Sequence, residues 1–288
     1  MKLVIGRDDL ARAAVEATGA ERLAVKPVHK ASKSFVNDQA VDLAELAIVT
    51  LLQAVAHGRP VVLLPVTALG RYQHQTLVTM GALTVGDIEG RSAGVRSWSQ
   101  TTGVWMRGFL TEQYGVDLRK VAWTTYEGAH VDGARDPDFV ARAPEGAKLQ
   151  ADFLGGRLDF GIMGNELPDD DRIRTAIPGA REAAAEWSRA NGFAPVNHVL
   201  GVTEQAAREH SGAVCAAYDA MREVIASLPR GGEPVDLNPV GFAALRGAVS
   251  RAAAYALDQG VLPRPVEFDE LVDASCAALG VPASRLGG

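Results

Sequence analysis

The chain has 288 residues, of which 47% are hydrophobic and 22% are charged, proportions that are ordinary for a soluble globular protein. This length exceeds what one hydrophobic core usually supports, so we expect two lobes. The formal net charge is −6, and the sequence has no basic run, which argues against a nucleic-acid partner. A local cluster of donors would therefore have to hold any anionic ligand against the overall field.

The N-terminus and the cysteines favour a cytoplasmic protein. Only four apolar or small residues separate Lys2 from Arg7, which is too short an apolar core for a signal peptide, and no apolar run approaches membrane-spanning length. Cys215 and Cys276 lie in apolar helical stretches, where buried free thiols and a reducing compartment are expected. No His and Cys pair has zinc-like spacing. We expect a cytoplasmic protein with no metal and no membrane partner, unless a leader has been trimmed.

Strands and helices alternate along the first part of the chain, which predicts an α/β protein with mostly parallel sheets. The run VVLLPV at 61–66 is almost wholly apolar, as in a strand that is covered on both faces. Glu45 interrupts another apolar strand, and a buried carboxylate needs a partner. The predicted strands are 2–5, 22–28, 43–49, 61–66 and 76–80, and the predicted helices are 8–17 and 50–57.

The alternation restarts after Thr84 and gives way to helices near Glu204. Strands are predicted at 92–96, 121–125, 158–163 and 195–202, helices at 100–114, 149–156 and 182–191, and C-terminal helices at 204–227, 241–259 and 268–279. The polar segment 132–145 is expected to be a surface loop. We predict a lobe I of residues 1–84 and 197–288 and a lobe II of residues 85–196. Two crossovers would form a hinge, with a ligand between the lobes at the carboxyl ends of the strands.

The segment from Gly94 to Asp117 contains the densest group of donors. It reads GVRSWSQTTGVWMRGFLTEQYGVD, which predicts a strand end, a polar loop and then a helix. The start of a helix has four unpaired backbone amides and a partial positive charge. A carboxylate, sulfate or phosphate suits such a place, and an ordinary capped surface helix is the alternative. The donors gathered here are Arg96, Ser97, Ser99, Thr101 and Thr102.

Polar residues also follow other predicted strands. Arg71 and His74 follow the strand at 61–66, where a surface ion pair and a solvated histidine are the alternatives to a functional role. His198 lies in the apolar strand VNHVLG and is either a satisfied core histidine or a group that faces the cleft. Lys30 and Ser34 follow the second strand and belong either to the same cleft or to a solvated loop.

Three stretches resemble the 4,5-dihydroxyphthalate decarboxylase family: LAELAIVTLLQAVAHGRPVVLLPV at 43–66, DIEGRSAGVRSWSQTTGVWMRGFLTEQYGVD at 87–117 and LDFGIMG at 158–164. The resemblance covers roughly residues 43–202. It implies the type 2 periplasmic-binding-protein fold, which transporter receptors and two lyases of menaquinone synthesis share. The family often carries an Arg-His-Ser motif after the fourth strand, and Arg71 and His74 occupy that place here with different spacing.

The resemblance implies a cofactor-independent decarboxylase that acts on a hydroxylated aromatic carboxylic acid. A hydroxyl para to the departing carboxylate lets the ring take up a proton at the carbon that bears the carboxylate, after which CO2 leaves. His74 is the first candidate for the proton donor and His198 the second, because histidine titrates near neutral pH. Either Glu45 or Glu127 is expected to assist the phenol. The expected substrate contacts are Arg71, Arg96, Ser97, Ser99, Thr101, Thr102, Lys30, Ser34, Glu127 and Asn165.

Two other functions fit the same scaffold. A solute-binding protein would capture an anionic or aromatic ligand without chemistry, and the fold alone does not separate it from an enzyme. Such a protein needs a leader or a lipid-attached cysteine near its start, whereas the first cysteine here is Cys215. The third possibility is another reaction, such as a dehydration, or a hydrolysis that uses Ser97 or Ser99. Apolar positions expected to be exposed in the C-terminal helices, such as Val249, Ala253 and Leu257, make a homodimer plausible, and the core of one protomer is the alternative place for them.

Overall fold

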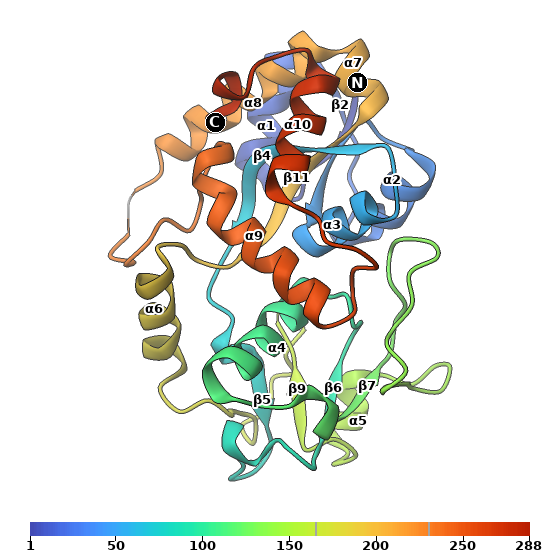
Figure 1. The fold of residues 1–288 in the computed structure, drawn as a ribbon, viewed down its shortest axis with the longest axis vertical. Coiled ribbons are helices and arrows are strands. Elements are labelled where there is room, and N and C mark those ends of the chain that lie inside the picture. Colours follow the sequence, from blue (N-terminus) through green and yellow to red (C-terminus); the bar gives the residue numbers. More distant parts are fainter. Residues whose placement is uncertain (165, 230) are drawn as a thin grey trace.

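A computed structural model describes residues 1–164, 166–229 and 231–288 and shows two α/β lobes stacked along the long axis of the molecule (Figure 1). Both chain termini lie in the first lobe, at the upper end of Figure 1. The expected two-lobed α/β fold with C-terminal helices is confirmed. No helix in the described part of the chain combines the length and apolar character needed to cross a bilayer.

The first lobe is built on a five-stranded sheet with the order β2-β1-β3-β11-β4. Its strands are β1 (Lys2–Val4), β2 (Glu21–Arg22), β3 (Leu43–Ala47), β4 (Val61–Gly70) and β11 (Val196–Thr203). β1 runs parallel to β2 and β3, whereas β11 runs antiparallel to both β3 and β4. β4 lies at the edge of the sheet, which is where a strand tolerates a proline such as Pro65.

The helices of the first lobe come from both ends of the chain. They are α1 (Asp8–Thr18), α2 (Ser32–Asp38), α3 (Ile48–Ala56), α7 (Glu204–Glu209), α8 (Ser211–Ala226), α9 (Phe242–Asp258) and α10 (Phe268–Leu279). The predicted helix 204–227 is divided at His210 between α7 and α8. The predicted strand 22–28 is much shorter, and the polar segment after it forms the short 3-10 helix η1 (Val28–Ala31) and then α2, whose Phe35 and Val36 reach the core.

The second lobe contains a six-stranded sheet with the order β10-β5-β9-β6-β7-β8. The strands are β5 (Leu77–Thr79), β6 (Ser92–Val95), β7 (Ala122–Thr125), β8 (Val140–Arg142), β9 (Phe160–Ile162) and β10 (Arg174–Thr175), and the helices are α4 (Thr101–Tyr114), α5 (Leu149–Leu154) and α6 (Ala180–Asn191). The predicted lobe boundary after residue 84 is wrong, because β5 already pairs with β9 in this sheet. The predicted loop 132–145 contains β8, which pairs with β7.

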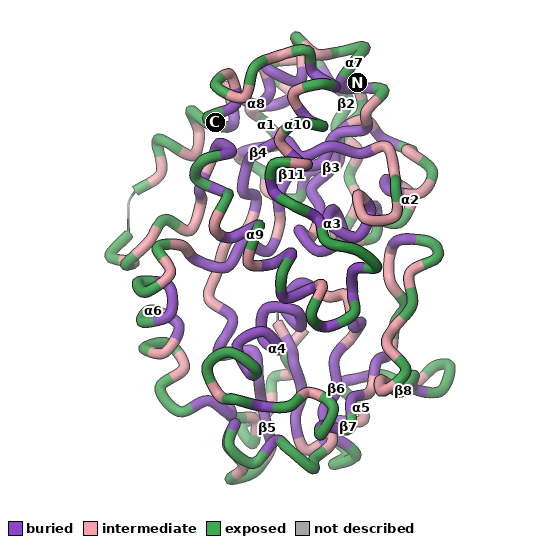
Figure 2. The backbone as a smooth tube through the Cα atoms, viewed as in Figure 1, coloured by how far each residue is buried: buried purple, intermediate pink, exposed green. Residues whose placement is uncertain are grey.

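The two lobes are joined by more than the crossovers that follow β4 and precede β11. Helix α9 runs from the first lobe down to the second and packs on α4 (Figure 1). A Cβ atom on Gly108 of α4 would lie 2.1 Å from the ring of Tyr255 on α9, so glycine permits this close approach. The large buried core cluster includes residues from both lobes, and Figure 2 shows buried residues on both α9 and α4.

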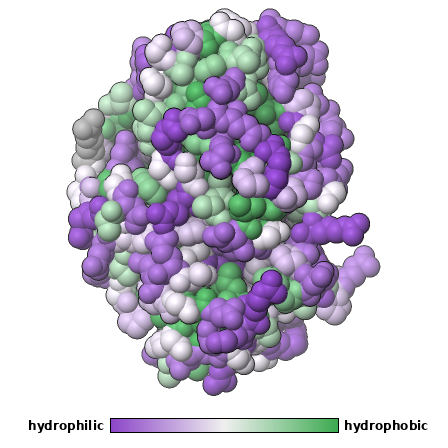
Figure 3. Space-filling view, in the orientation of Figure 1, coloured by the Kyte–Doolittle hydropathy of each residue, from purple (hydrophilic) through white to green (hydrophobic). Residues whose placement is uncertain are grey.

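The apolar positions of α9 face this shared core rather than solvent. Val249 is 1% exposed and Ala253 is 6% exposed, so the expectation that they form an exposed apolar surface is wrong. On the face seen in Figure 3, hydrophobic residues form separate groups between hydrophilic ones. The apolar surface of α9 therefore gives no support to a homodimer.

Candidate functional site

A cavity of about 360 Å³ lies between the lobes, at the ends of β3 and β6 and beside the crossing strands. Six of the predicted substrate-binding residues line it together: Arg71, Arg96, Ser97, Ser99, Thr101 and Thr102. Thr50, Gln100 and Asn197 add further polar groups to its wall. The predicted cluster of donors after β6 therefore faces an inter-lobe cavity and not bulk solvent.

Two helices, one from each lobe, begin at this cavity. The residue before α4, Gln100, and the residue before α3, Ala47, both line it, and neither makes a side-chain cap. The backbone N–H of Val49 in α3 donates to Oγ1 of Thr101 in α4 at 3.2 Å, which brings the two helix starts together. Partial positive charge from both helices is thus directed to the same place, where a negative ligand is favoured.

Arg71 enters the cavity from the segment that follows β4. Its Nη2 donates to Oγ1 of Thr102 at 3.4 Å, and Nδ2 of Asn197 donates to the same oxygen at 3.3 Å. A Cβ atom at Gly164 would lie 2.5 Å from Nη2 of Arg71, so this glycine, the last residue of the LDFGIMG stretch, makes room for the guanidinium. Burial lowers the pKa of Arg71 from its ordinary value, although arginine stays charged near neutral pH.

Arg96 follows β6 and contacts two carboxylates. Its Nη1 donates to Oε2 of Glu127 at 2.8 Å, and its Nε lies 3.8 Å from Oε1 of Glu166. The Arg96 side chain is 22% exposed, whereas that of Glu127 is 54% exposed. Glu166 lines the cavity. Arginine presents five N–H donors in a planar fork, so these two contacts leave donors for a ligand carboxylate.

His198 and the buried Glu45 form a hydrogen-bonded pair on neighbouring strands. Nδ1 of His198 lies 2.6 Å from Oε1 of Glu45, whose Oε2 accepts from the backbone N–H groups of Gly6 at 2.8 Å and Arg7 at 3.2 Å. Burial raises the pKa of Glu45, but the hydrogen bonds from His198 and these amides together lower it more, and the net pKa lies below its ordinary value. Glu45 is therefore a carboxylate at neutral pH.

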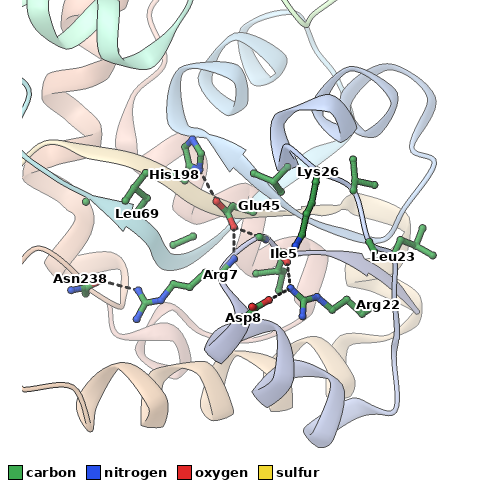
Figure 4. A pocket seen from close by; sticks show the side chains of 16 residues that line it. Ile5, Arg7, Asp8, Arg22, Leu23, Lys26, Glu45, Leu69, His198 and Asn238 are labelled. Atoms are coloured by element: carbon green, nitrogen blue, oxygen red, sulfur yellow. Dashed lines mark hydrogen bonds and ion pairs between the residues drawn. The ribbon is translucent and has the colours of Figure 1, made fainter. Parts of the chain in front are cut away.

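Strand β11 is irregular where it carries His198. Its register with β4 shifts on both sides of this residue, and such bulges commonly re-aim a side chain near a functional site. Nδ1 of the ring faces Glu45, and the other nitrogen, Nε2, points away from that carboxylate (Figure 4). Among the residues that the structure describes, none bonds to Nε2, and His198 lines the inter-lobe cavity.

A second cavity of about 760 Å³ lies in the first lobe and is shown in Figure 4. It shares His198 and Leu69 with the inter-lobe cavity, so the imidazole lies where the two meet. Arg7 and Arg22 line it and pair with Asp9 and Asp8, respectively. Sequence analysis missed this part of the molecule because its charged residues are spread over distant segments and match no motif.

A pair of histidines spans the cavity between the lobes. The rings of His29, in η1, and His130, after β7, are stacked with centroids 6.4 Å apart, and Nδ1 of His130 lies 3.3 Å from Oγ1 of Thr50. Burial and the nearby charge of Arg96 lower the pKa of both histidines, that of His130 to about 4. Both rings are therefore neutral at pH 7. Neither was predicted to be in the site.

His74, the first candidate for the proton donor, lies elsewhere. Its ring is 1% exposed and stacks on Phe109 of α4 with centroids 4.3 Å apart, and its Nε2 lies 2.7 Å from Oε1 of Gln113. The expectation of a polar loop at the cleft is wrong, because the short 3-10 helix η2 (His74–Thr76) packs against α4 and α6. His74 thus belongs to the interior of the second lobe.

Of the four other predicted contacts, three do not line the inter-lobe cavity. The fourth lies outside the described residues. Lys30 is exposed, and Ser34 donates to the carbonyl of Ala31 within its own short segment. Glu127 supports Arg96 without lining the cavity. Asn165 lies outside the residues that the structure describes.

Ser97 and Ser99 are held by hydrogen bonds that do not involve a histidine. Oγ of Ser97 lies 3.2 Å from Oγ of Ser99 and 3.3 Å from the carbonyl oxygen of Gly128, so these serines bond to each other and to the backbone rather than to a histidine. Within the described ranges, no three His, Cys, Asp or Glu side chains are arranged to hold a metal ion.

Comparison with known proteins gives no matching family model. The chain is 27% identical over 204 residues to a 4,5-dihydroxyphthalate decarboxylase of Comamonas testosteroni, and this match covers 64% of this chain and 61% of that protein. It is 25% identical over 167 residues to a 4,5-dihydroxyphthalate decarboxylase of Pseudomonas putida, with 52% of this chain and 64% of that protein covered. Each match thus spans less than two thirds of the relative.

Similar solved structures include binding proteins and an enzyme. The alkanesulfonate-binding protein SsuA of Xanthomonas axonopodis pv. citri gives a TM-score of 0.52 at 15% identity, with 94% of this chain and 96% of that chain covered. A ligand-binding component of an ABC-type import system from Staphylococcus aureus gives a TM-score of 0.58 at 8% identity, and the match covers 94% of each chain. The desulfurization enzyme DSZB gives a TM-score of 0.56 at 16% identity, with 97% of this chain and 99% of that chain covered. The chain therefore has the two-lobed fold of periplasmic binding proteins and resembles two 4,5-dihydroxyphthalate decarboxylases in sequence.

Proposed function

We propose that this protein is a cofactor-independent decarboxylase of a hydroxylated aromatic carboxylic acid, similar to dihydroxyphthalate, that binds between the lobes. The observation that carries the proposal is the placement of the His198–Glu45 pair at a cavity that also contains Arg71, Arg96 and the start of α4. Anion-binding groups and a titratable imidazole with a fixed orientation therefore meet at one site. The names of the two distant relatives point to the same reaction class.

Arg71 and Arg96 hold carboxylate groups of the substrate in this proposal. Both can form paired, charge-assisted hydrogen bonds with a carboxylate. The uncapped amides at the start of α4 supply further donors. The stacked rings of His29 and His130 line the same cavity and offer a flat, uncharged surface for an aromatic ring.

His198 donates the proton through Nε2. Protonated His198 transfers this proton to the ring carbon that bears the carboxylate, while a para hydroxyl supplies electron density to the ring. The bond between that carbon and the carboxylate then breaks, its electrons restore the aromatic ring, and CO2 leaves. Glu45 keeps Nδ1–H directed toward itself, so that Nε2 remains the donor, and water returns a proton to His198. A positioned acid of this kind contributes roughly 10²- to 10⁴-fold to a rate.

The test is incubation of the purified protein with a panel of hydroxylated benzoates and phthalates while CO2 release and heat of binding are followed in parallel. Release of one CO2 per acid consumed supports the decarboxylase. The second candidate, a solute-binding protein, is favoured by the likeness to the sulfonate-binding protein. Tight binding with no CO2 release across the panel would support that candidate and contradict the proposed reaction.

A further inference from the structure

Glu166 is the one acidic residue among the described residues that line the inter-lobe cavity. Its Oε1 accepts a hydrogen bond from Nε2 of Gln100 at 3.0 Å and lies 3.8 Å from Nε of Arg96. Its Oε2 has no hydrogen bond to any other residue in the described ranges, and 31% of the side chain is exposed. One oxygen of this carboxylate is therefore fixed by the protein, and the other is open to a ligand.

A carboxylate at this place opposes the binding of an acid, because like charges within several ångströms repel each other. Arg96 does not need Glu166 to balance its charge, because Nη1 of Arg96 already donates to Oε2 of Glu127 at 2.8 Å. The negative charge becomes favourable when the ligand also brings a hydrogen-bond donor. A ring hydroxyl is such a donor, and its hydrogen bond to an ionised acceptor is roughly twice as strong as one to a neutral acceptor.

From this geometry we infer that Glu166 accepts a hydrogen bond from a ring hydroxyl of the substrate while the neighbouring Arg96 binds one of its carboxylates. The inference rests on the proposed function, because it takes the ligand to be a hydroxylated aromatic acid. Glu166 then determines specificity: it favours acids that carry the hydroxyl and repels the same acids without it. A phenol that is hydrogen-bonded to a carboxylate also donates more electron density to the ring carbon that takes up the proton.

Two matched ligands separate this role from a purely electrostatic one. The dissociation constants of 4,5-dihydroxyphthalate and phthalate are measured by calorimetry for the wild type, Glu166→Gln and Glu127→Gln, after thermal unfolding has shown that each variant folds. Phthalate has no ring hydroxyl and so reports charge alone. Glu127 contacts the same arginine without lining the cavity, which makes Glu127→Gln the matched control.

For Glu166→Gln we expect the preference for the dihydroxylated acid over phthalate to fall roughly 10- to 100-fold, the usual range for a lost hydrogen bond to a charged group. Phthalate itself should bind equally well or more tightly, because a like charge has been removed. Glu127→Gln should leave the preference unchanged.

Equal changes for the two acids in Glu166→Gln would overturn the inference and leave only a charge effect through Arg96. Binding of neither acid to the wild type would overturn this inference and the proposed function together. Hydroxyl-selective binding without CO2 release would contradict the decarboxylase alone and would still support the role of Glu166.

Discussion

Nδ1 of His198 and Oε1 of Glu45 lie 2.6 Å apart on the neighbouring antiparallel strands β11 and β3. β11 is one of the strands at the crossover between the lobes, so this pair ties the imidazole to the rigid sheet of the first lobe while its other nitrogen is left for the cavity. Histidine titrates near neutral pH, and a fixed carboxylate partner determines which of its nitrogens can serve a ligand. The arrangement makes His198 a stronger candidate for the acid than His74.

Replacement of Glu45 by glutamine tests this positioning role. Glu45→Gln removes the negative charge beside Nδ1 but keeps the shape of the side chain, so we expect kcat for decarboxylation to fall roughly 10- to 100-fold, within the range of acid–base contributions, with little change in KM. Asp42→Asn is the matched control, because Asp42 begins the same strand region and contacts the N-terminal segment rather than the histidine. A variant with unchanged kcat would remove Glu45 from the reaction.

Arg96 and Arg91 allow a paired test of anion binding. Arg96 follows β6 at the cavity, whereas Arg91 precedes the same strand and is 50% exposed beside Asp159. We expect Arg96→Ala to weaken the binding of an aromatic di-acid roughly 10- to 100-fold, as for a lost charged hydrogen bond, and to change thermal stability little. Arg91→Ala should leave the affinity unaltered. Calorimetry measures both, and equal affinities in the two variants would exclude Arg96 from the site.

The low pKa of His130 predicts a loss of stability in mild acid. The pKa falls from 6.5 to about 4 on folding, so between these values the unfolded chain binds more protons than the folded protein. The contribution of neutral His130 is therefore complete above pH 6.5 and declines as the pH falls toward 4. A shift of this size corresponds to at most about 3 kcal/mol.

Urea unfolding of the wild type and His130→Asn between pH 7.5 and 4.5 checks this expectation. The variant should lose less stability across the window than the wild type does. His210→Asn is the control, because His210 is exposed between α7 and α8. Parallel stability curves for the wild type and His130→Asn would contradict the assignment.

The contact between α4 and α9 should not tolerate a side chain at Gly108. A Cβ atom there would lie 2.1 Å from Cδ2 of Tyr255, so Gly108→Ala must move the two helices apart. Overpacking of this kind costs roughly 1–3 kcal/mol. Gly212→Ala in α8, where a Cβ atom meets nothing within 4 Å, should be neutral or slightly stabilising. Denaturant unfolding compares the two, and equal stabilities would mean that α9 does not join the lobes as tightly as its contacts indicate.

Much of the fold could be predicted because the spacing of apolar residues indicates where most strands and helices lie. The strand around Glu45, the helix after Gln100 and the strand around His198 lie close to where the pattern placed them. Short polar elements were missed: α2 (Ser32–Asp38) has a weak apolar pattern and is held by the packing of Phe35 and Val36. The lobe boundary was placed too late because the predicted strand 76–80 was assigned to the wrong sheet, since β9, the strand that β5 pairs with, is distant in sequence.

The candidate site was predicted where donors are adjacent in sequence and missed where the fold gathers them. Arg96, Ser97, Ser99 and Thr101 follow one strand, so local sequence was sufficient. His29 and His130 meet only across the lobes, and no local pattern records such a contact. His74 has a polar sequence neighbourhood but stacks on Phe109, a burial that depends on tertiary packing. Glu166 lies two residues after the end of the LDFGIMG stretch, and that position was the available signal.

The most direct measurement is proton NMR of the reaction of 4,5-dihydroxyphthalate in D2O with the wild type and with His198→Asn, accompanied by calorimetric binding of the same acid. The account predicts that the wild type releases CO2 and places one deuterium on the ring carbon that loses the carboxylate, whereas His198→Asn binds the acid but turns it over at least about 100-fold more slowly. The account would be contradicted if His198→Asn turned the acid over as fast as the wild type does. It would also be contradicted if the wild type bound the acid without forming any deuterated product.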